Sequence, residues 1–240
     1  MRIAILSDIH GAYAPFQSAL TAARKCGFDK LVILGDLLTY GIDPVECCEL
    51  AAQALVKDQA ILVAGNHDQI YKDLEDSRTS YLDRVPRWVA ESVQWTWDQI
   101  GQRWPNNLPM VEEWKCDNIL FAHANPFGYG NWAYLRTNAD LCLAAEKLVS
   151  RNIRAGIFGH SHRFAHLSSP DADVTVVGAI GQPRNQSKKT PEWTLLQIEG
   201  ARIELVRHDI SFDSSAHRAA IHATVSLTQE TRNKLCEYFI

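Results

Sequence analysis

Five short segments of the sequence place side chains that can bind metal ions directly after apolar runs. They read Asp8-Ile9-His10, Gly35-Asp36, Gly65-Asn66-His67-Asp68, His123-Ala124-Asn125 and Gly159-His160-Ser161-His162. Five of the nine histidines of the chain fall within them. Each residue taken singly could form a turn or cap a helix. Carboxylates and imidazoles that converge on one place, however, repel one another or lack partners unless a cation compensates them.

The types of these side chains favour transition-metal ions. Carboxylate and amide oxygens combined with imidazole, with no thiolate beside them, suit manganese, iron, zinc or cobalt better than a structural zinc site. Two aspartates, one asparagine and at least four histidines are too many ligands for one ion. Two ions about 3.5–4 Å apart that share a carboxylate would use all of them. We therefore predict two divalent ions, with Mn²⁺ expected first and Fe, Zn, Co or Ni as alternatives.

The apolar runs that precede these residues have the length and composition of buried strands. They cover residues 2–6, 31–34, 60–64, 118–122 and 155–158. Helical spacing over residues 13–26 and 44–57 separates the first three runs, with Asp43 predicted as an N-cap and Pro44 in the first turn. This βαβαβ order predicts a parallel sheet, and the carboxyl edge of such a sheet is where ligands bind.

The rest of the chain follows other patterns. Residues 163–168, 173–178, 193–198 and 202–208 alternate like strands, with Asp171 and Gly200 among the turn residues, and predict a mainly antiparallel second half. Residues 69–118 predict a helical insertion that carries five of the seven tryptophans. We interpret these rings as the core of a helical subdomain, with a cap over the site as the alternative. Residues 211–240 predict a C-terminal tail with a helix from about Thr228, and we expect one domain over residues 1–240.

Composition excludes several classes of protein. A chain of 240 residues with 46% hydrophobic and 22% charged residues is typical of a globular protein. No run approaches the roughly 18 apolar residues of a membrane span, and the N-terminal run is too short for a signal peptide, so we expect a cytoplasmic protein. The net charge of −4 argues against a nucleic-acid partner. The basic stretch 184–189 is the one local candidate for such binding, and it is typical of a solvated loop.

The motifs DIH, GDLLTYG, GNHD, AH and GHSH, in this order and at these spacings, resemble those of the calcineurin-like metallophosphoesterase superfamily. GAIGQPR, over residues 178–184, is similar to the GSxGQPR motif of the small bacterial and archaeal phosphoesterase branch. The resemblance implies an α/β fold in which two β-sheets form a sandwich flanked by helices (αββα). It does not cover the tryptophan-rich insertion or the tail.

The resemblance also implies a role for each site residue. It assigns Asp8, His10 and His162 to one metal and Asn66, His123 and His160 to the other, with Asp36 bridging the two. His67 matches the residue that faces the phosphate, and Asp68 is expected to orient it. Asn66 is expected to contact the substrate as well as a metal. Arg184 is a candidate clamp on the phosphate, with a surface or salt-bridging role left open.

The implied activity is the hydrolysis of a phosphodiester or phosphomonoester of a small molecule. In this family a hydroxide bridging two metal ions attacks phosphorus, and an imidazole acid such as His67 assists the leaving oxygen. Phosphoprotein phosphatases of the superfamily carry GDxVDRG, whereas Tyr40 stands here at the position of that arginine. This departure favours the small phosphodiesterase branch.

Four alternatives stay open. Two are other enzymes of the family, a Ser/Thr-type phosphoprotein phosphatase and a dinucleoside polyphosphate hydrolase. A non-catalytic scaffold of the same fold is the alternative from another class. A nuclease of the superfamily would need a basic track, which the charge distribution does not supply. The oligomeric state is not predicted.

Overall fold

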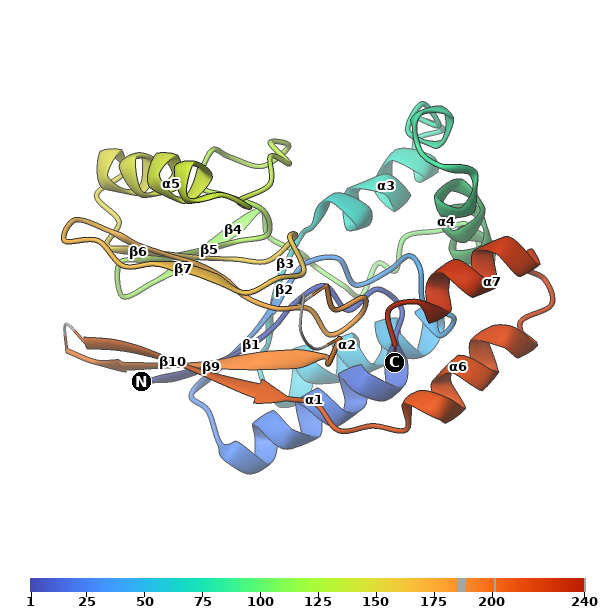
Figure 1. Ribbon diagram of the computed structural model, residues 1–240, viewed down its shortest axis with the longest axis horizontal. Coiled ribbons are helices and arrows are strands. Elements are labelled where there is room, and N and C mark those ends of the chain that lie inside the picture. Colours follow the sequence, from blue (N-terminus) through green and yellow to red (C-terminus); the bar gives the residue numbers. More distant parts are fainter. Residues whose placement is uncertain (185–188, 201, 240) are drawn as a thin grey trace.

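Two five-stranded β-sheets lie face to face in the computed structural model, which describes residues 1–184, 189–200 and 202–239 (Figure 1). The first sheet contains, in spatial order, β10 (Arg202–Asp209), β9 (Glu192–Glu199), β1 (Arg2–Leu6), β2 (Lys30–Leu34) and β3 (Ile61–Val63). The second contains β4 (Glu113–Cys116), β5 (Ile119–Ala122), β6 (Ala155–Phe158), β8 (Asp173–Val176) and β7 (Ala165–Leu167).

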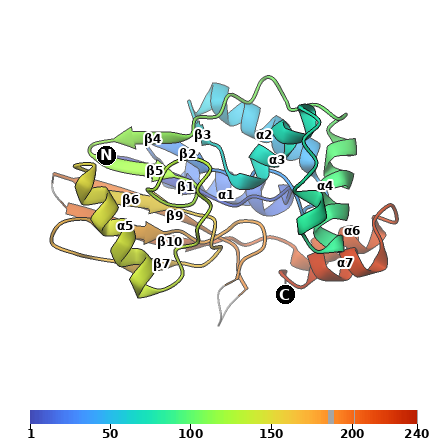
Figure 2. The ribbon, with the colours of Figure 1, turned by 90° about the horizontal axis from the view of Figure 1, so that it is seen from above.

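Helices cover the outer faces of both sheets and one end of the sandwich. The helices α1 (Tyr13–Cys26) and α2 (Pro44–Lys57) lie against the first sheet, and α5 (Asn138–Ser150) lies against the second (Figure 1). The remaining helices gather at one end (Figure 2). They are α3 (Asn66–Glu75), the short 3-10 helix η1 (Leu82–Arg84), α4 (Arg87–Gln99), α6 (Ser214–Ala223) and α7 (Gln229–Cys236).

The alternation of side chains along β1 shows why its sequence is apolar throughout. Ala4 and Leu6 pack toward α1 and α2, whereas Ile3 and Ile5 pack between the two sheets. A strand that is buried on both faces needs apolar residues at successive positions. The predicted α/β double-sheet sandwich is confirmed.

Several predicted elements agree closely with the structure. The helices α1 and α2 have the predicted bounds, and β1, β2 and β3 pair in parallel as expected. Asp43 does precede α2, but its side chain makes no capping hydrogen bond. The five strand ends that carry the candidate ligands belong to two sheets rather than one, because β5 and β6 pair in the second sheet.

The expected antiparallel second half is correct only in part. β9 pairs antiparallel with β1 and β10, but β8 pairs in parallel with β6 and separates it from β7. Burial explains this order. Three of the four residues of β8 are buried, whereas none of the three residues of β7 is. The more apolar strand therefore takes the inner position of the sheet.

The tryptophan-rich insertion contains α3, η1 and α4, and it continues through a non-helical segment over residues 100–112 to β4, which forms the edge of the second sheet. Trp97 and Trp104 are buried in the core beside α2, and Trp114 packs on Phe121 with ring centroids 5.0 Å apart. The indole N–H of Trp95 donates to a hydroxyl of the C-terminal region, Ser226 Oγ, at 2.8 Å. These contacts agree with the interpretation of the rings as packing residues.

The C-terminal region forms two helices, of which only the second was predicted. The Thr228 side chain accepts a hydrogen bond from the Thr231 amide and caps α7. The preceding helix, α6, buries only His217 and Ile221, and it contains a single large apolar residue, so little in the sequence marks it as a helix. Among the described residues, no helix is long and apolar enough to cross a membrane.

Candidate metal centre

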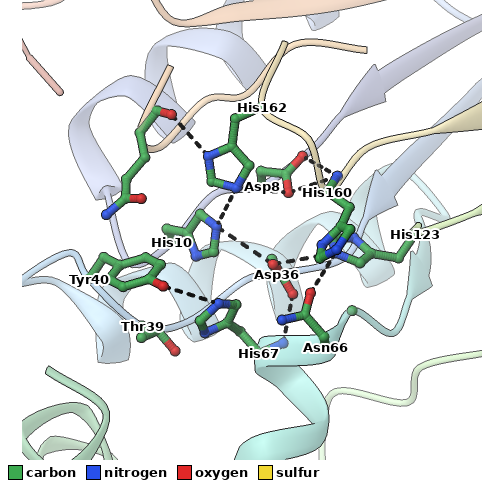
Figure 3. A network of polar contacts seen from close by, with 12 residues as sticks. Asp8, His10, Asp36, Thr39, Tyr40, Asn66, His67, His123, His160 and His162 are labelled. Atoms are coloured by element: carbon green, nitrogen blue, oxygen red, sulfur yellow. Dashed lines mark hydrogen bonds and ion pairs between the residues drawn. The ribbon is translucent and has the colours of Figure 1, made fainter. Parts of the chain in front are cut away.

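The candidate ligands lie in the turns that follow β1, β2, β5 and β6 and at the start of α3 (Figure 3). Five of them have a left-handed backbone, with φ values between 50° and 64°: Asp8, His10, Asp36, His160 and His162. This conformation costs a residue other than glycine about 1–2 kcal/mol. Such strain tends to occur at functional sites, where it aims a side chain that a relaxed turn would not.

Two glycines of the motifs allow the turns to approach one another. A Cβ atom on Gly65 would overlap the carboxylate of Asp36. One on Gly159 would overlap the Ser7 hydroxyl and lie 2.7 Å from an oxygen of Asp8. Close packing around the two carboxylates therefore explains the glycines of GNHD and GHSH.

One group of possible ligands comprises Asp8, His10, Asp36 and His162, whose ligand atoms all lie within 4.8 Å of one another. His10 Nε2 is 3.6 Å from Asp36 Oδ2, and His162 Nε2 is 3.4 Å from Asp8 Oδ1. The two Nε2 atoms of His10 and His162 are 3.1 Å apart (Figure 3). All four residues are buried.

The second nitrogen of each of these two rings contacts a backbone carbonyl. His10 Nδ1 is 3.1 Å from the oxygen of Leu38, and His162 Nδ1 is 2.9 Å from that of Gln182. Burial lowers the pKa of His10 to about 3 and that of His162 well below its ordinary value, so both rings are neutral. A carbonyl only accepts, so each Nδ1 carries the proton and each Nε2 carries a lone pair.

Two lone pairs that face each other at 3.1 Å repel. A cation bound by both nitrogens removes that repulsion, and metal-binding histidines usually donate their other N–H to a carbonyl or carboxylate. The donor set of carboxylate oxygens and neutral imidazole nitrogens therefore fits a divalent transition-metal ion.

A second group of possible ligands comprises Asp36, His123 and His160. His123 Nε2 lies 3.3 Å from Asp36 Oδ2 and 3.2 Å from Asn66 Oδ1, while its Nδ1 lies 2.8 Å from the oxygen of Leu34. His160 Nε2 contacts the carbonyl oxygen of Trp132 at 3.0 Å, which leaves Nδ1 as its ligand atom. Asp36 Oδ2 faces both groups, so one oxygen is placed between them.

The protonation of the second group differs from that of the first. Burial alone would lower the pKa of His123, but the carboxylates of Asp36 and Asp8 raise it to about 10. Burial lowers the pKa of His160 to about 3. Without a cation, the proton on His123 thus balances the charge of Asp36, which a metal ion would do when bound.

His67 lies beside the two groups, and its Nε2 is 3.3 Å from the hydroxyl oxygen of Tyr40 (Figure 3). Its backbone amide donates to Asp36 Oδ1 at 2.8 Å. Among the described residues, its Nδ1 has no hydrogen-bond partner. Burial, with the nearby charges of His123 and Arg184, lowers the pKa of His67 and keeps the free ring neutral.

The hydrogen bonds of Asp68 differ from those expected of a residue that orients His67. Its carboxylate accepts hydrogen bonds from the amides of Asp36 at 2.8 Å, Leu37 at 3.0 Å and Gly65 at 2.8 Å. No described hydrogen bond joins it to the imidazole of His67. Asp68 therefore holds together the two turns that carry Asp36 and Asn66. Its position three residues after Gly65, in the first turn of α3, is the sequence signal for this role.

Arg184 lies at the edge of the site. Its Nη2 donates to Gln182 Oε1 at 3.0 Å, and its guanidinium carbon lies 5.7 Å from the Tyr238 ring centroid. Its charge helps to lower the pKa values of His10 and His162, so it acts on the site electrostatically. Most of the basic stretch 184–189 lies outside the described residues, which end at 184 and resume at 189.

A cavity of about 420 Å³ opens beside the ligand groups. Asn66, His67 and His160 line it at the metal side, and Tyr81, Trp132 and Tyr134 line it elsewhere. None of the five tryptophans of the insertion is among its lining residues. Tyr81 belongs to the insertion over residues 69–118, and Trp132 and Tyr134 belong to the loop over residues 125–138, which is rich in Gly, Tyr and Trp. These are the two segments that the sequence indicates as shaping a substrate pocket, although it does not indicate which of their rings line it.

Comparison with known proteins gives a consistent result. The sequence profile of the family described as calcineurin-like phosphoesterase matches residues 1–164. An uncharacterized protein of Methanocaldococcus jannaschii is 26% identical over 221 residues, which cover 85% of this chain and 86% of the relative.

Two solved structures share the fold over nearly the whole of both chains. A hypothetical protein of Pyrococcus horikoshii has a TM-score of 0.82 at 15% identity, with 98% of this chain and 97% of the other covered. A metallophosphoesterase of Sphaerobacter thermophilus has a TM-score of 0.74 at 21% identity, with 99% and 100% covered.

Proposed function

The chain belongs to the calcineurin-like phosphoesterase family, and we propose that it hydrolyses a phosphate ester of a small molecule with two divalent transition-metal ions. The observation that carries the proposal is the position of Asp36 Oδ2, 3.6 Å from His10 Nε2 and 3.3 Å from His123 Nε2. One carboxylate oxygen shared by two sets of imidazoles is the arrangement that a pair of cations needs.

In this proposal Asp8, His10 and His162 hold one ion, Asn66, His123 and His160 hold the other, and Asp36 contacts both. Manganese is the expected metal, with Fe, Zn, Co or Ni as alternatives. When bound, the two ions would lower the pKa of a water molecule and neutralise charge on the phosphate.

His67 supplies the proton chemistry. The free ring is neutral, and a phosphate dianion in the cavity would raise its pKa and let it carry a proton. The protonated ring then donates to the leaving oxygen or stabilises its charge. The hydroxyl of Tyr40, 3.3 Å from His67 Nε2, orients the ring. Asp68 acts indirectly, through the turns that it ties together.

Two features support a small phosphodiester or phosphomonoester over a macromolecule. Tyr40 occupies the place of the arginine of phosphoprotein phosphatases, and its ring packs on Trp88 with centroids 5.5 Å apart. The net charge of −4 does not favour a polyanion such as a nucleic acid. Arg184 is the described cation that we propose as an additional contact to phosphate.

The test is metal content together with hydrolysis. The purified protein is stripped with EDTA, reloaded with Mn²⁺, Fe²⁺, Zn²⁺ or Co²⁺, and assayed on bis(p-nitrophenyl) phosphate and p-nitrophenyl phosphate. We expect about two ions per chain and metal-dependent hydrolysis. Asn66→Ala should lower both, whereas Asn107→Ala, at an exposed position, should change neither. A protein that binds no metal and hydrolyses neither ester would instead support the scaffold alternative.

A further inference from the structure

The cavity beside the metal groups is much larger than a phosphate. Its volume is about 420 Å³, which lies within the range of about 300–1,000 Å³ of pockets that hold a whole small-molecule ligand. Asn66, His67 and His160 line only one end. Most of the cavity therefore remains for the organic group of the ester.

Aromatic rings form much of the remaining wall. Tyr81 and His67 lie in a T-shaped arrangement, with ring centroids 6.4 Å apart and planes at 79°. Tyr134 is fixed by stacking on His160, with centroids 4.2 Å apart and planes at 9°, and the Arg136 guanidinium covers it at 3.6 Å. Because both faces of Tyr134 are in use, this ring offers an edge to the cavity. Ring edges pack well against the face of another aromatic ring.

The polar groups of the far wall are paired with one another. Asp73 receives hydrogen bonds from Arg78 and from Gln69, both at 2.7 Å. The other polar atom of Gln69, Oε1, accepts from the Tyr129 hydroxyl at 2.5 Å. Arg84 donates to the carbonyl oxygen of Ser80 at 3.0 Å. A flat apolar ring can bind beside these pairs without displacing them.

We propose that the organic group of the substrate contains a flat aromatic ring, which binds in this cavity against Tyr81 and Trp132. The inference rests on the proposed function, because it names the class of ester that the same site would hydrolyse. Stacking on protein aromatics contributes about 1–3 kcal/mol per ring, which corresponds to a preference of about 5- to 140-fold.

Two pairs of esters test this preference, each with a leaving alcohol of similar acidity within the pair. Adenosine 5′-monophosphate is compared with ribose 5-phosphate, and benzyl phosphate with cyclohexylmethyl phosphate, as monoesters and as their methyl diesters. We expect kcat/KM to favour the aromatic member by at least about fivefold in one pair. The first pair detects a ring carried on a sugar, and the second a ring close to phosphorus.

Substitutions in the cavity wall then test where the aromatic ring of the substrate binds. Tyr81→Leu and Trp132→Leu should each reduce the ratio of kcat/KM within the preferred pair by about fivefold or more. Phe127→Leu, at an exposed position of the same loop as Trp132 but outside the cavity lining, should leave the ratio unchanged. The ratio is measured on one enzyme preparation, so a partly unfolded variant does not distort it.

The outcomes separate this inference from the proposed function. Hydrolysis of both members of each pair at equal kcat/KM overturns the aromatic preference while supporting the esterase. A preference that survives both substitutions places the ring elsewhere and also overturns the inference. Failure to hydrolyse any ester in the metal-loaded state contradicts the proposed function itself.

Discussion

The backbone amide of Tyr40 donates to the hydroxyl oxygen of Ser92 at 2.9 Å, which ties the residue beside His67 to helix α4. Tyr40 has a φ of 71°, so its strained turn depends on such contacts. α4 in turn rests on the C-terminal region, because Glu91 accepts hydrogen bonds from the amide and the hydroxyl of Thr228, both at 2.6 Å. The insertion and the tail thus support the substrate side of the site.

Ser92→Ala should lower both stability and activity. It leaves the buried amide of Tyr40 without a partner, which costs about 1–3 kcal/mol, and it frees Tyr40 from the position in which it contacts His67. Urea unfolding and kcat are measured beside metal content, which should not change. Ser150→Ala removes an exposed hydroxyl on α5 and serves as the control. An unaltered kcat for Ser92→Ala would show that α4 does not support the site.

Asp36→Asn should lower the metal content of the protein more than Asp8→Asn does. Asp36 belongs to both ligand groups, whereas Asp8 belongs to one. We expect the first variant to lose both ions and the second to keep part of its metal, measured by elemental analysis after gel filtration. Asp58→Asn, which affects a pair with Arg24 away from the site, is the matched control. Equal losses from the two site variants would contradict the sharing of Asp36.

His67→Ala should slow hydrolysis about 10²- to 10⁴-fold, the usual contribution of a positioned acid. Its imidazole belongs to neither ligand group, so the metal content should stay at the wild-type value. Steady-state kinetics and elemental analysis on the same sample check both statements. A variant that loses its metal would mean that His67 holds an ion rather than a proton.

Folding should become less stable at acid pH because of His217. Its ring packs on Phe212 and Phe239, with centroids 5.9 Å and 4.5 Å apart, and burial lowers its pKa to about 4. In the unfolded chain the ring takes up a proton below a pKa of about 6.5. Its contribution is therefore complete above about pH 6.5 and is lost as the pH falls toward 4.

This single group should account for about 2 kcal/mol of the stability lost between pH 7 and pH 5. His217→Leu should remove that part of the pH dependence, measured by urea unfolding at both pH values. His222→Leu, at an exposed position of the same helix, should retain it. An identical pH dependence in the wild type and His217→Leu would exclude this explanation.

The parts of the fold and of the metal site that depend on local sequence pattern could be predicted from the sequence. The helices α1 and α2 have strong apolar periodicity, and the ligand types after each strand reveal the chemistry without coordinates. The sequence could not predict which carbonyl oxygens orient the imidazoles, namely those of Leu34, Leu38 and Gln182. They are backbone atoms, and their positions depend on how distant turns meet.

The role of Asp68 and the position of Trp114, the last tryptophan of the insertion, were not predicted, for a related reason. Asp68 looked like a partner for the histidine next to it, but three amides from neighbouring turns surround its carboxylate. Trp114 lies on a four-residue edge strand that is too short to show a period of its own. Contacts between residues far apart in the sequence determine the role of Asp68 and the position of Trp114.

The place of β1 in its sheet also bears on how the protein is made. Asp8 and His10 are synthesised before β9, yet β1 lies between β2 and β9, and Ile3 pairs with Leu196. The first sheet is incomplete until β9 and β10 have left the ribosome. The earliest ligands synthesised are thus among the last to be fixed, so metal loading is expected to follow translation rather than accompany it.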